Sequence, residues 1–316
     1  NKPPKRCAAS LRRDYKSSNN HHPPPYPNCS AGNMGTISDG DSPVQGYSRN
    51  GGITVARVIS LHSFRGGTGK SNITANTAAA IAQTGRRVGV VDTDIQSPGI
   101  HLIFQLSERR IKRTLNDYLW GRCSVKEATY DVTPPELETS SGQIFLTPSS
   151  MNAGDISRVL HEAYDARQLK DGFKELIREL DLDYLLIDTH PGLNEETLLS
   201  IAISHVLVVI LRPDTQDYQG TSVTLEVAQK LGVPQTFLVL NKVLLASSNS
   251  KEIDQLVERY RQKLGQTYHR PVGTILPLAE EMIRLESSNL FILQSPNHRF
   301  TQGIEELGEK IVATEK

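Results

Sequence analysis

Short, continuously apolar segments recur along the chain from residue 55 onward. They are rich in Val, Ile and Leu, and several of them end at a charged or polar residue. Strands buried on both faces of a sheet have this continuous pattern, whereas half-exposed strands alternate apolar and polar positions. The pattern therefore predicts strands at residues 55–63, 87–92, 143–146, 182–188, 205–211, 235–240 and 272–276.

Amphipathic or alanine-rich segments lie between these strands. Their apolar residues recur at helical spacing, and the segments contain almost no proline, so they predict helices at residues 72–83, 115–120, 124–128, 155–180, 220–231, 250–264 and 302–312. Strands that alternate with helices form parallel sheets, because each helix returns the chain to the same end of the sheet. We therefore expect an α/β fold: a doubly wound, mostly parallel sheet with helices on both faces.

The first 54 residues do not follow this pattern. Seven of the 17 prolines lie there, Ser, Asn and Gly abound, and large aliphatic residues are nearly absent. Such a segment cannot bury enough apolar surface to offset its ordering entropy. We expect residues 1–54 to be disordered and residues 55–316 to form one domain. Because the chain starts with Asn1, we also expect that translation begins at Val55 or Met34 and that the upstream residues are not native.

Charge and cysteine usage narrow the function classes. Lys+Arg and Asp+Glu both number 35, so nucleic-acid binding is not indicated, although a local basic face stays open. The three cysteines, Cys7, Cys29 and Cys123, form no C-x-x-C pair, so neither a disulfide framework nor a zinc or iron–sulfur site is encoded. No apolar run reaches membrane-spanning length. We expect a cytoplasmic location.

The segment SFRGGTGKSN, residues 63–72, joins the first predicted strand to the first predicted helix. Glycines let backbone N–H groups converge on an oxyanion, and the helix N-terminus adds its positive end. Lys70 is placed to bind terminal phosphates, and Ser71 to ligate Mg²⁺. Phe64 stands where the strict P-loop pattern has its first glycine, and a glycine cluster alone can be a flexible turn. Gly69-Lys70-Ser71 at a strand–helix junction favours a nucleotide site.

Two other predicted strands end in aspartate. The strand at residues 87–92 ends at Asp92 and is followed by Asp94, and the strand at residues 182–188 ends at Asp188. Ligands of parallel sheets bind beyond these strand ends, where the carboxylates can orient water or bind Mg²⁺. Asp92 and Asp94 can also simply cap a turn. His190 is more typical of a loop residue with a local hydrogen bond than of a general base.

One further polar residue follows a strand end. Asn241 comes directly after the predicted strand at residues 235–240. Its amide can both donate to and accept from the edge of an adenine. The sequence therefore predicts base recognition at Asn241.

Together these segments resemble the MinD/ParA family of deviant-Walker P-loop ATPases. The resemblance covers residues 55–314 and rests on four segments in the family's order: FRGGTGKS, GVVDTDIQSPG, LLIDTHPGL, and LVLNKV with ILPLAEE. It implies a P-loop NTPase that hydrolyses ATP with Mg²⁺ as an ATP-dependent homodimer, in which two subunits face each other across two nucleotides. The family's usual work is positioning of the cell-division site, of chromosomes or of other cargo.

The resemblance also implies the roles of individual residues. Arg65, Lys70 and Asp94 would be catalytic, with Asp94 orienting the attacking water. The metal site would comprise Ser71, Asp92 and Asp188. Nucleotide contacts would come from Gly66, Gly67, Thr68, Gly69, Lys70, Ser71, Asn72, Gly192, Asn241 and Pro277, with Gly192 sensing the γ-phosphate and Pro277 lying near the base.

Arg65 departs from the family pattern, which has a lysine that reaches the partner subunit's phosphates. Arginine keeps the charge and the reach, so Arg65 is expected to act in trans as an arginine finger. The alternative is that Arg65 supports nucleotide binding within its own subunit.

Two functions remain open from the sequence: a slow ATPase that switches a partner or surface, and a nucleotide-dependent regulatory module with little hydrolysis. An activator or cargo protein is expected, but nothing identifies it. Iron–sulfur carriers of the wider superfamily need paired cysteines, which are absent. The final segment, GIEELGEKIVATEK, is acidic to neutral, so a C-terminal membrane anchor is not expected.

Overall fold

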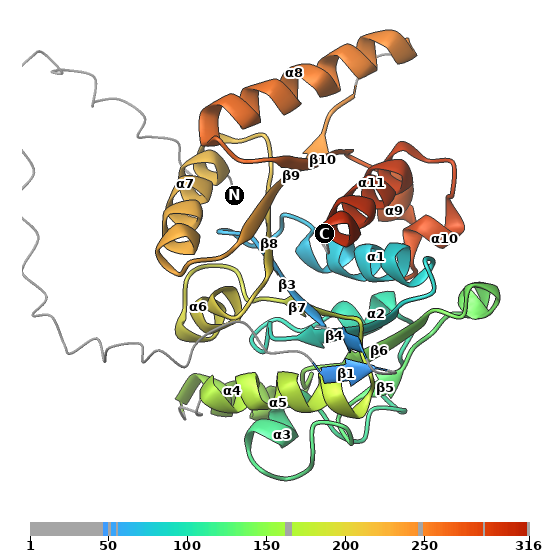
Figure 1. The fold of residues 1–316 in the computed structure, drawn as a ribbon, viewed down its shortest axis with the longest axis vertical. Coiled ribbons are helices and arrows are strands. Elements are labelled where there is room, and N and C mark those ends of the chain that lie inside the picture. The colour runs from blue at the N-terminus through green and yellow to red at the C-terminus, as the bar shows by residue number, and fades with distance from the viewer. Residues whose placement is uncertain are drawn as a thin grey trace, which may run out of the picture. The chain divides into compact units, whose positions relative to one another are not determined.

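The computed structural model describes residues 47–49, 52–54, 56–161, 166–245, 249–286 and 288–314, all within one compact unit, Asp39–Lys316. Its main sheet is formed by β3 (Arg57–His62), β4 (Arg87–Asp92), β5 (Tyr130–Asp131), β6 (Gln143–Thr147), β7 (Tyr184–Asp188), β8 (Val206–Leu211), β9 (Gln235–Val243) and β10 (Val272–Pro277). Within the described residues the strand order is β10-β9-β8-β3-β7-β4-β6-β5 (Figure 1).

The sheet is parallel apart from one edge. Every pair from β10 to β6 is parallel, and only the short β5 runs antiparallel to β6. β3 lies between β7 and β8, so the loop that follows β3 emerges at the middle of the sheet. The predicted doubly wound, mostly parallel architecture is confirmed, because parallel neighbours require crossover connections.

Helices cover both faces of the sheet. The helices are α1 (Lys70–Ala82), α2 (Ile100–Ile103), α3 (Leu115–Leu119), α4 (Ala153–His161), α5 (Ala166–Glu179), α6 (Glu195–Ala202), α7 (Thr215–Lys230), α8 (Ser250–Tyr268), α9 (Glu280–Arg284), α10 (Phe291–Gln294) and α11 (Arg299–Ala313), with a 3₁₀ turn at Pro135–Ser140. Alternate residues of β8 enter different cores: Val208 belongs to the core that includes residues of α1 and α11, and Val209 belongs to the core that includes residues of α6 and α7. This explains the continuously apolar strands.

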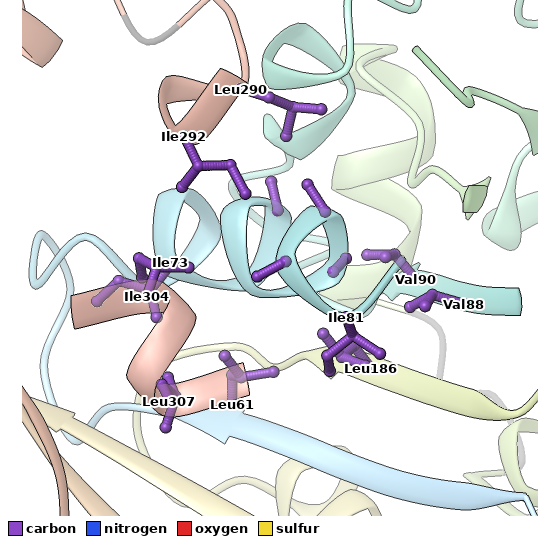
Figure 2. Close-up of a cluster of buried hydrophobic side chains, with 14 of the residues drawn as sticks. Leu61, Ile73, Ile81, Val88, Val90, Leu186, Leu290, Ile292, Ile304 and Leu307 are labelled. Atoms are coloured by element: carbon purple, nitrogen blue, oxygen red, sulfur yellow. The ribbon is translucent and has the colours of Figure 1, made fainter. Parts of the chain in front are cut away.

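α1 is the most enclosed helix, and it carries the loop of residues 63–72 at its N-terminus. Its alanines are buried on all sides, so it has no polar face. Figure 2 shows strand residues such as Leu61 and Leu186 on one side of α1, Ile304 and Leu307 of α11 beside it, and Ile292 of α10 above it. A helix start held this rigidly is suited to positioning a ligand.

The secondary-structure predictions were wrong at a few places. Residues 125–128 form turns rather than a helix: Ser124 and Glu127 exchange hydrogen bonds as at a helix start, but no helix follows. α7 begins at Thr215, five residues before the predicted start at residue 220, since the Asp214 side chain caps it by accepting from the N–H of Asp217. Helices α2, α6, α9 and α10 were not predicted.

The N-terminal prediction falls mostly outside the described residues. Within residues 1–54 the structure describes β1 (Tyr47–Arg49) and β2 (Gly52–Thr54), which pair antiparallel. The disorder expected for this segment and the expected translation start at Val55 or Met34 therefore stay predictions.

Candidate functional site

The loop after β3 ends in a helix start that is open to an anion. Gly67 and Gly69 have φ of +76° and +92°, which a side chain would strain. Gly69 is the N-cap of α1, and this end has neither a side-chain cap nor an acidic residue in its first turn. Because the first N–H groups of a helix lack intrahelical partners, they are available to a ligand.

A cavity of about 200 Å³ lies over this loop. Most of the residues predicted to bind phosphate line it, and they come from the loop, from the segment after β4 and from the segment after β7. The lining residues are Ser63, Gly66, Gly67, Thr68, Gly69, Lys70, Ser71, Asn72, Asp94 and Pro191.

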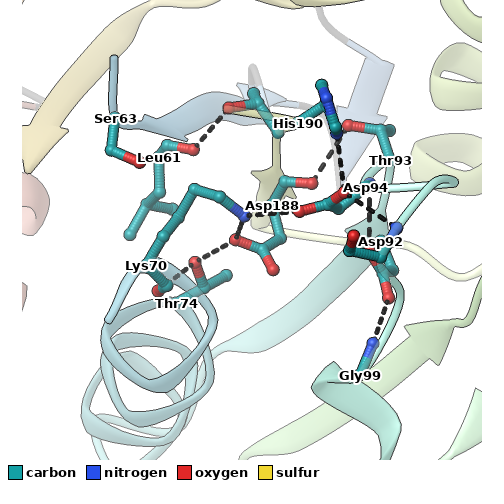
Figure 3. Close-up of polar contacts among 12 residues, drawn as sticks. Leu61, Ser63, Lys70, Thr74, Asp92, Thr93, Asp94, Gly99, Asp188 and His190 are labelled. Carbon is teal, nitrogen blue, oxygen red and sulfur yellow. Dashed lines mark hydrogen bonds and ion pairs between the residues drawn. The ribbon is translucent and has the colours of Figure 1, made fainter. Parts of the chain in front are cut away.

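Lys70 reaches from the first turn of α1 to the end of β7. Its Nζ lies 2.7 Å from Asp188 Oδ1 and 3.8 Å from Asp94 Oδ2, and the side chain is 6% exposed (Figure 3). Thr74, one turn along α1, donates to the same Asp188 oxygen at 3.0 Å. Asp188 Oδ2 is buried and has no hydrogen-bond partner among the described residues. A buried carboxylate oxygen of this kind fits a water or a metal-bound ligand.

Asp92 and Asp188 are direct neighbours in the register of β4 and β7. The Asp92 carboxylate accepts from the backbone N–H of Asp94 at 3.0 Å and of Gly99 at 3.4 Å, so it fastens its own loop (Figure 3). Burial, and secondly the charge of Asp188, raise the pKa of Asp92 well above its usual range, while Lys70 opposes this shift. Its contacts agree with the turn-capping alternative, and its role toward a metal ion stays a prediction.

Asp94 lines the cavity and is held by the segment after β7. Its Oδ1 lies 2.7 Å from His190 Nδ1 and accepts from the N–H of Ser97 at 3.2 Å (Figure 3). Its Oδ2 is the oxygen on the side of Lys70. His190 lies in a loop as predicted, but its hydrogen bond is not local. Its partner is Asp94, 96 residues earlier in the chain, the carboxylate expected to orient water.

The segment after β7 also contacts the glycine-rich loop directly. Gly192 has φ of +88°, and its N–H donates to Ser63 O at 3.3 Å. A movement of one segment would therefore shift or break this hydrogen bond to the other. The expected role of Gly192 toward the γ-phosphate stays a prediction.

A second cavity, of about 140 Å³, lies on the side where the base is expected. It is lined by Gly69, Asn72, Asn241, Lys242, Pro277, Leu278, Ala279, Met282, Ile283 and Phe300. Asn241 and Pro277, both predicted to lie near the base, line it. Asn241 Nδ2 donates to Thr68 O at 2.8 Å, so at least part of the amide is used to hold the loop.

Arg65 does not line the phosphate cavity of its own chain. Its Nη1 lies 3.9 Å from Asp214 Oδ1 and 4.0 Å from Asp217 Oδ1, at the start of α7, and its side chain is 43% exposed. Phe64 lies on the same helix, since a Cβ on Gly220 would come within 2.2 Å of Phe64 Cδ1. Both residues before the glycines are therefore docked on α7.

Gly220→Ala is expected to displace Phe64 and to weaken nucleotide binding. Alanine gains about 1 kcal/mol over glycine inside a helix, but overpacking typically costs about 1–3 kcal/mol. Gly265→Ala in α8 is the matched control, because no atom lies near its added Cβ. Thermal unfolding should rank Gly265→Ala above wild type and Gly220→Ala below it, and ATP titration should show weaker binding only for Gly220→Ala. Equal stabilisation with unchanged ATP affinity would contradict the importance of this contact.

The donors present fit a nucleotide with a magnesium ion. Ser71 lies at the helix start and lines the cavity, and Asp188, which Lys70 contacts, has one carboxylate oxygen without a partner in the part of the chain that the structure describes. Among the described residues no group of three or more His, Cys, Asp or Glu side chains is arranged to hold a metal ion. A hard cation here would therefore need oxygens from the nucleotide and from water, as Mg²⁺ at phosphate sites usually has.

Three contacts were not expected from the sequence. Thr74 donates to Asp188, Lys242 Nζ donates to Gly67 O at 2.8 Å, and His62 Nδ1 lies 2.9 Å from Thr189 Oγ1. Burial, with the nearby charges of Lys70 and His190, lowers the pKa of His62 to about 3. Thr74 is one helical turn after Lys70, a spacing that could have indicated it. The contacts of Lys242 and His62 depend on strand order, which the sequence does not contain.

Two further findings concern residues outside this site. Cys123, the one cysteine within the described residues, is a free thiol whose pKa is raised, chiefly by burial. In the part of the chain that the structure describes, no helix is both long and apolar enough to cross a membrane.

The chain is similar to known P-loop and ATP-binding proteins. A ParA family model, described as NUBPL iron-transfer P-loop NTPase, matches residues 54–312. An uncharacterized ATP-binding protein of Methanocaldococcus jannaschii is 30% identical over 199 residues, which are 63% of this chain and 68% of that protein. The septum site-determining protein MinD of Bacillus subtilis is 27% identical over 210 residues, 65% of this chain and 72% of that protein.

A solved structure matches over a larger share of the chain. The cell division ATPase MinD of Pyrococcus furiosus superposes with a TM-score of 0.64 at 22% identity, covering 82% of this chain and 99% of that one. At this identity the match concerns the fold.

Proposed function

The chain belongs to the MinD/ParA family of P-loop NTPases, and from this premise we propose that it is a slow, Mg²⁺-dependent ATPase. ATP would hold two copies of the chain together, and hydrolysis would release them. Such a switch would act in the cytoplasm in spatial positioning, of the cell-division site, of chromosomes or of other cargo. An unidentified activator or cargo protein would recognise whether the chain is dimeric or monomeric.

This proposal rests on one observation: residues at or after the ends of β3, β4 and β7 come together at the uncapped N-terminus of α1. Lys70 Nζ, at the start of α1, lies 3.8 Å from Asp94 Oδ2 after β4 and 2.7 Å from Asp188 Oδ1 at the end of β7. A cation, a water-directing carboxylate and a metal-directing carboxylate around an anion cradle are the parts that phosphoryl transfer needs.

The proposed roles follow these positions. Lys70 would bind the β- and γ-phosphates, Ser71 would ligate Mg²⁺, and Asp188 would hold the ion through water. Bound Mg²⁺ would neutralise charge on the phosphates. Asp94 would accept a hydrogen bond from the attacking water, and Asp92 would keep the Asp94 loop in place. The nucleotide would further contact Gly66, Gly67, Thr68, Gly69, Asn72, Gly192, Asn241 and Pro277.

One observation favours the alternative, a regulatory module with little hydrolysis. Arg65 is paired with Asp214 and Asp217 of its own chain, so it must leave these carboxylates before it can serve another subunit. If that exchange is unfavourable, nucleotide binding would proceed without appreciable turnover. Iron transfer, which the family model's description names, is not proposed, because the sequence has no C-x-x-C pair.

Turnover by the purified protein tests the proposal. Wild type should release phosphate from Mg²⁺–ATP, and Asp94→Ala should lower that rate by roughly 10²–10⁴-fold, the usual contribution of a positioned acid or base, while ATP still binds. The rates are measured by phosphate release and the affinity by titration with ATP. Tight ATP binding by wild type without any turnover would favour the regulatory module instead.

A further inference from the structure

His190 is placed beside Asp94 by the register of the sheet. β4 and β7 are parallel neighbours, with Asp92 opposite Asp188. His190 follows Asp188 by two residues, just as Asp94 follows Asp92, so the two side chains meet beyond the strand ends. Figure 3 shows the imidazole above the Asp94 carboxylate, joined to it by a dashed line.

The contact is short and well enclosed. His190 Nδ1 lies 2.7 Å from Asp94 Oδ1, with the side chains 21% and 11% exposed. Because a carboxylate oxygen only accepts, Nδ1 must carry the hydrogen in this contact. The His190 main chain is fixed as well, since Thr197 Oγ1 donates to its carbonyl at 3.2 Å. The donor is therefore held by α6 rather than by a free loop.

The two oxygens of Asp94 are consequently used differently. Oδ1 receives two hydrogens, one from His190 and one from the N–H of Ser97. Oδ2 faces Lys70 Nζ at 3.8 Å, on the side of the cavity. Two donors on one oxygen fix the rotation of the carboxylate, so that the other oxygen keeps one direction.

We propose that His190 is a positioning residue for ATP hydrolysis, which orients Asp94 by donating from Nδ1. This inference rests on the proposed function, in which Asp94 directs the attacking water. His190 touches neither phosphate nor water in this role and acts only through Asp94. It links the segment after β7 to the segment after β4, so that hydrolysis depends on both being in place.

The test compares two substitutions at residue 190. His190→Ala removes the donor and should lower kcat by roughly 10–100-fold, the range for a hydrogen bond to a charged group, with ATP affinity within about twofold of wild type. His190→Asn keeps an N–H at the position of Nδ1 and should recover most of the lost kcat. His190→Ala in an Asp94→Ala background should cause no further loss. Each protein is measured for phosphate release, ATP binding and thermal unfolding.

The outcomes separate this inference from the proposed function. Wild-type kcat in His190→Ala would overturn the inference while leaving the ATPase proposal intact. Equal losses in His190→Ala and His190→Asn would also overturn it, because bulk rather than hydrogen-bond donation would then matter. No turnover by wild type would overturn the proposed function itself, and the inference with it.

Discussion

Lys70→Ala is expected to lower ATP affinity by roughly 100-fold and to abolish measurable turnover. Charge-assisted hydrogen bonds contribute up to about 3 kcal/mol each, and Lys70 is the cation in contact with both Asp94 and Asp188. Without it, no cation among the described residues would offset the carboxylates of Asp94 and Asp188 next to the incoming phosphates. Titration with ATP and phosphate release measure the two effects.

The control for Lys70→Ala is a lysine that is remote from the cavity. Lys230 lies at the end of α7, is 72% exposed and pairs with Glu226 within its own helix. Lys230→Ala should bind and hydrolyse ATP like wild type, because surface pairs of this kind contribute little. Thermal unfolding of both variants checks that Lys70→Ala is folded. ATP binding by Lys70→Ala at wild-type affinity would contradict the assignment of the cradle.

Arg65→Ala is expected to bind ATP normally and to lose turnover by roughly 10³–10⁵-fold, the range for an arginine finger. The physical reason is that Arg65 lies outside its own phosphate cavity, paired with Asp214 and Asp217. It therefore has no contact there whose loss would weaken ATP binding. ATP titration and single-turnover rates measure the two effects.

Arg65→Lys is the informative companion variant. Lysine keeps the charge but cannot form two parallel hydrogen bonds to one phosphate. We expect an intermediate rate for Arg65→Lys, because the family pattern places lysine at this position. If Arg65→Ala instead weakened ATP binding and left the rate unchanged, Arg65 would act within its own subunit.

The architecture could be read from the sequence because the core strands are fully buried. β4 and β7 are apolar between their ends, so their presence and their parallel arrangement follow from the pattern. The bounds of β4 agree with the prediction, whereas β7 begins at Tyr184, two residues after the predicted start. The loop residues Gly69, Lys70 and Ser71 are contiguous, so their proximity needs no knowledge of the fold. The grouping of these three residues at the start of one helix could therefore be predicted from the sequence.

The contacts between residues that follow different strands of the site could not be predicted. Asp94 meets His190 only because β4 and β7 are neighbours, and Asn241 meets Thr68 only because β9 ends near the loop. The order of strands in a sheet cannot be deduced from the spacing of residues along the sequence. The short helix α10 was missed for a different reason: its Phe291 and Ile292 are buried in the core that contains α1, so tertiary packing rather than helix propensity determines it.

The contacts of Phe64 and Arg65 with α7 could not be predicted from the sequence either. The predicted helix started at residue 220, and the acidic cap at Asp214 and Asp217 that receives Arg65 lies before it. A more careful reading of Asp214 as an N-cap would have moved the helix start to Thr215. It would still not have placed Gly220 under Phe64, because that contact depends on the order of β3 and β8.

The proposed ATP-bound dimer and the role in trans expected for Arg65 together require that hydrolysis use residues from two copies of the chain. The direct test mixes Arg65→Ala with Asp94→Ala, each inactive alone. A mixed dimer pairs the intact Asp94 of one copy with the intact Arg65 of the other at one of its two nucleotides. Phosphate release should recover to about a quarter of the wild-type rate, because half of randomly formed dimers are mixed and each has one complete site. A mixture as inactive as its components would contradict the claim.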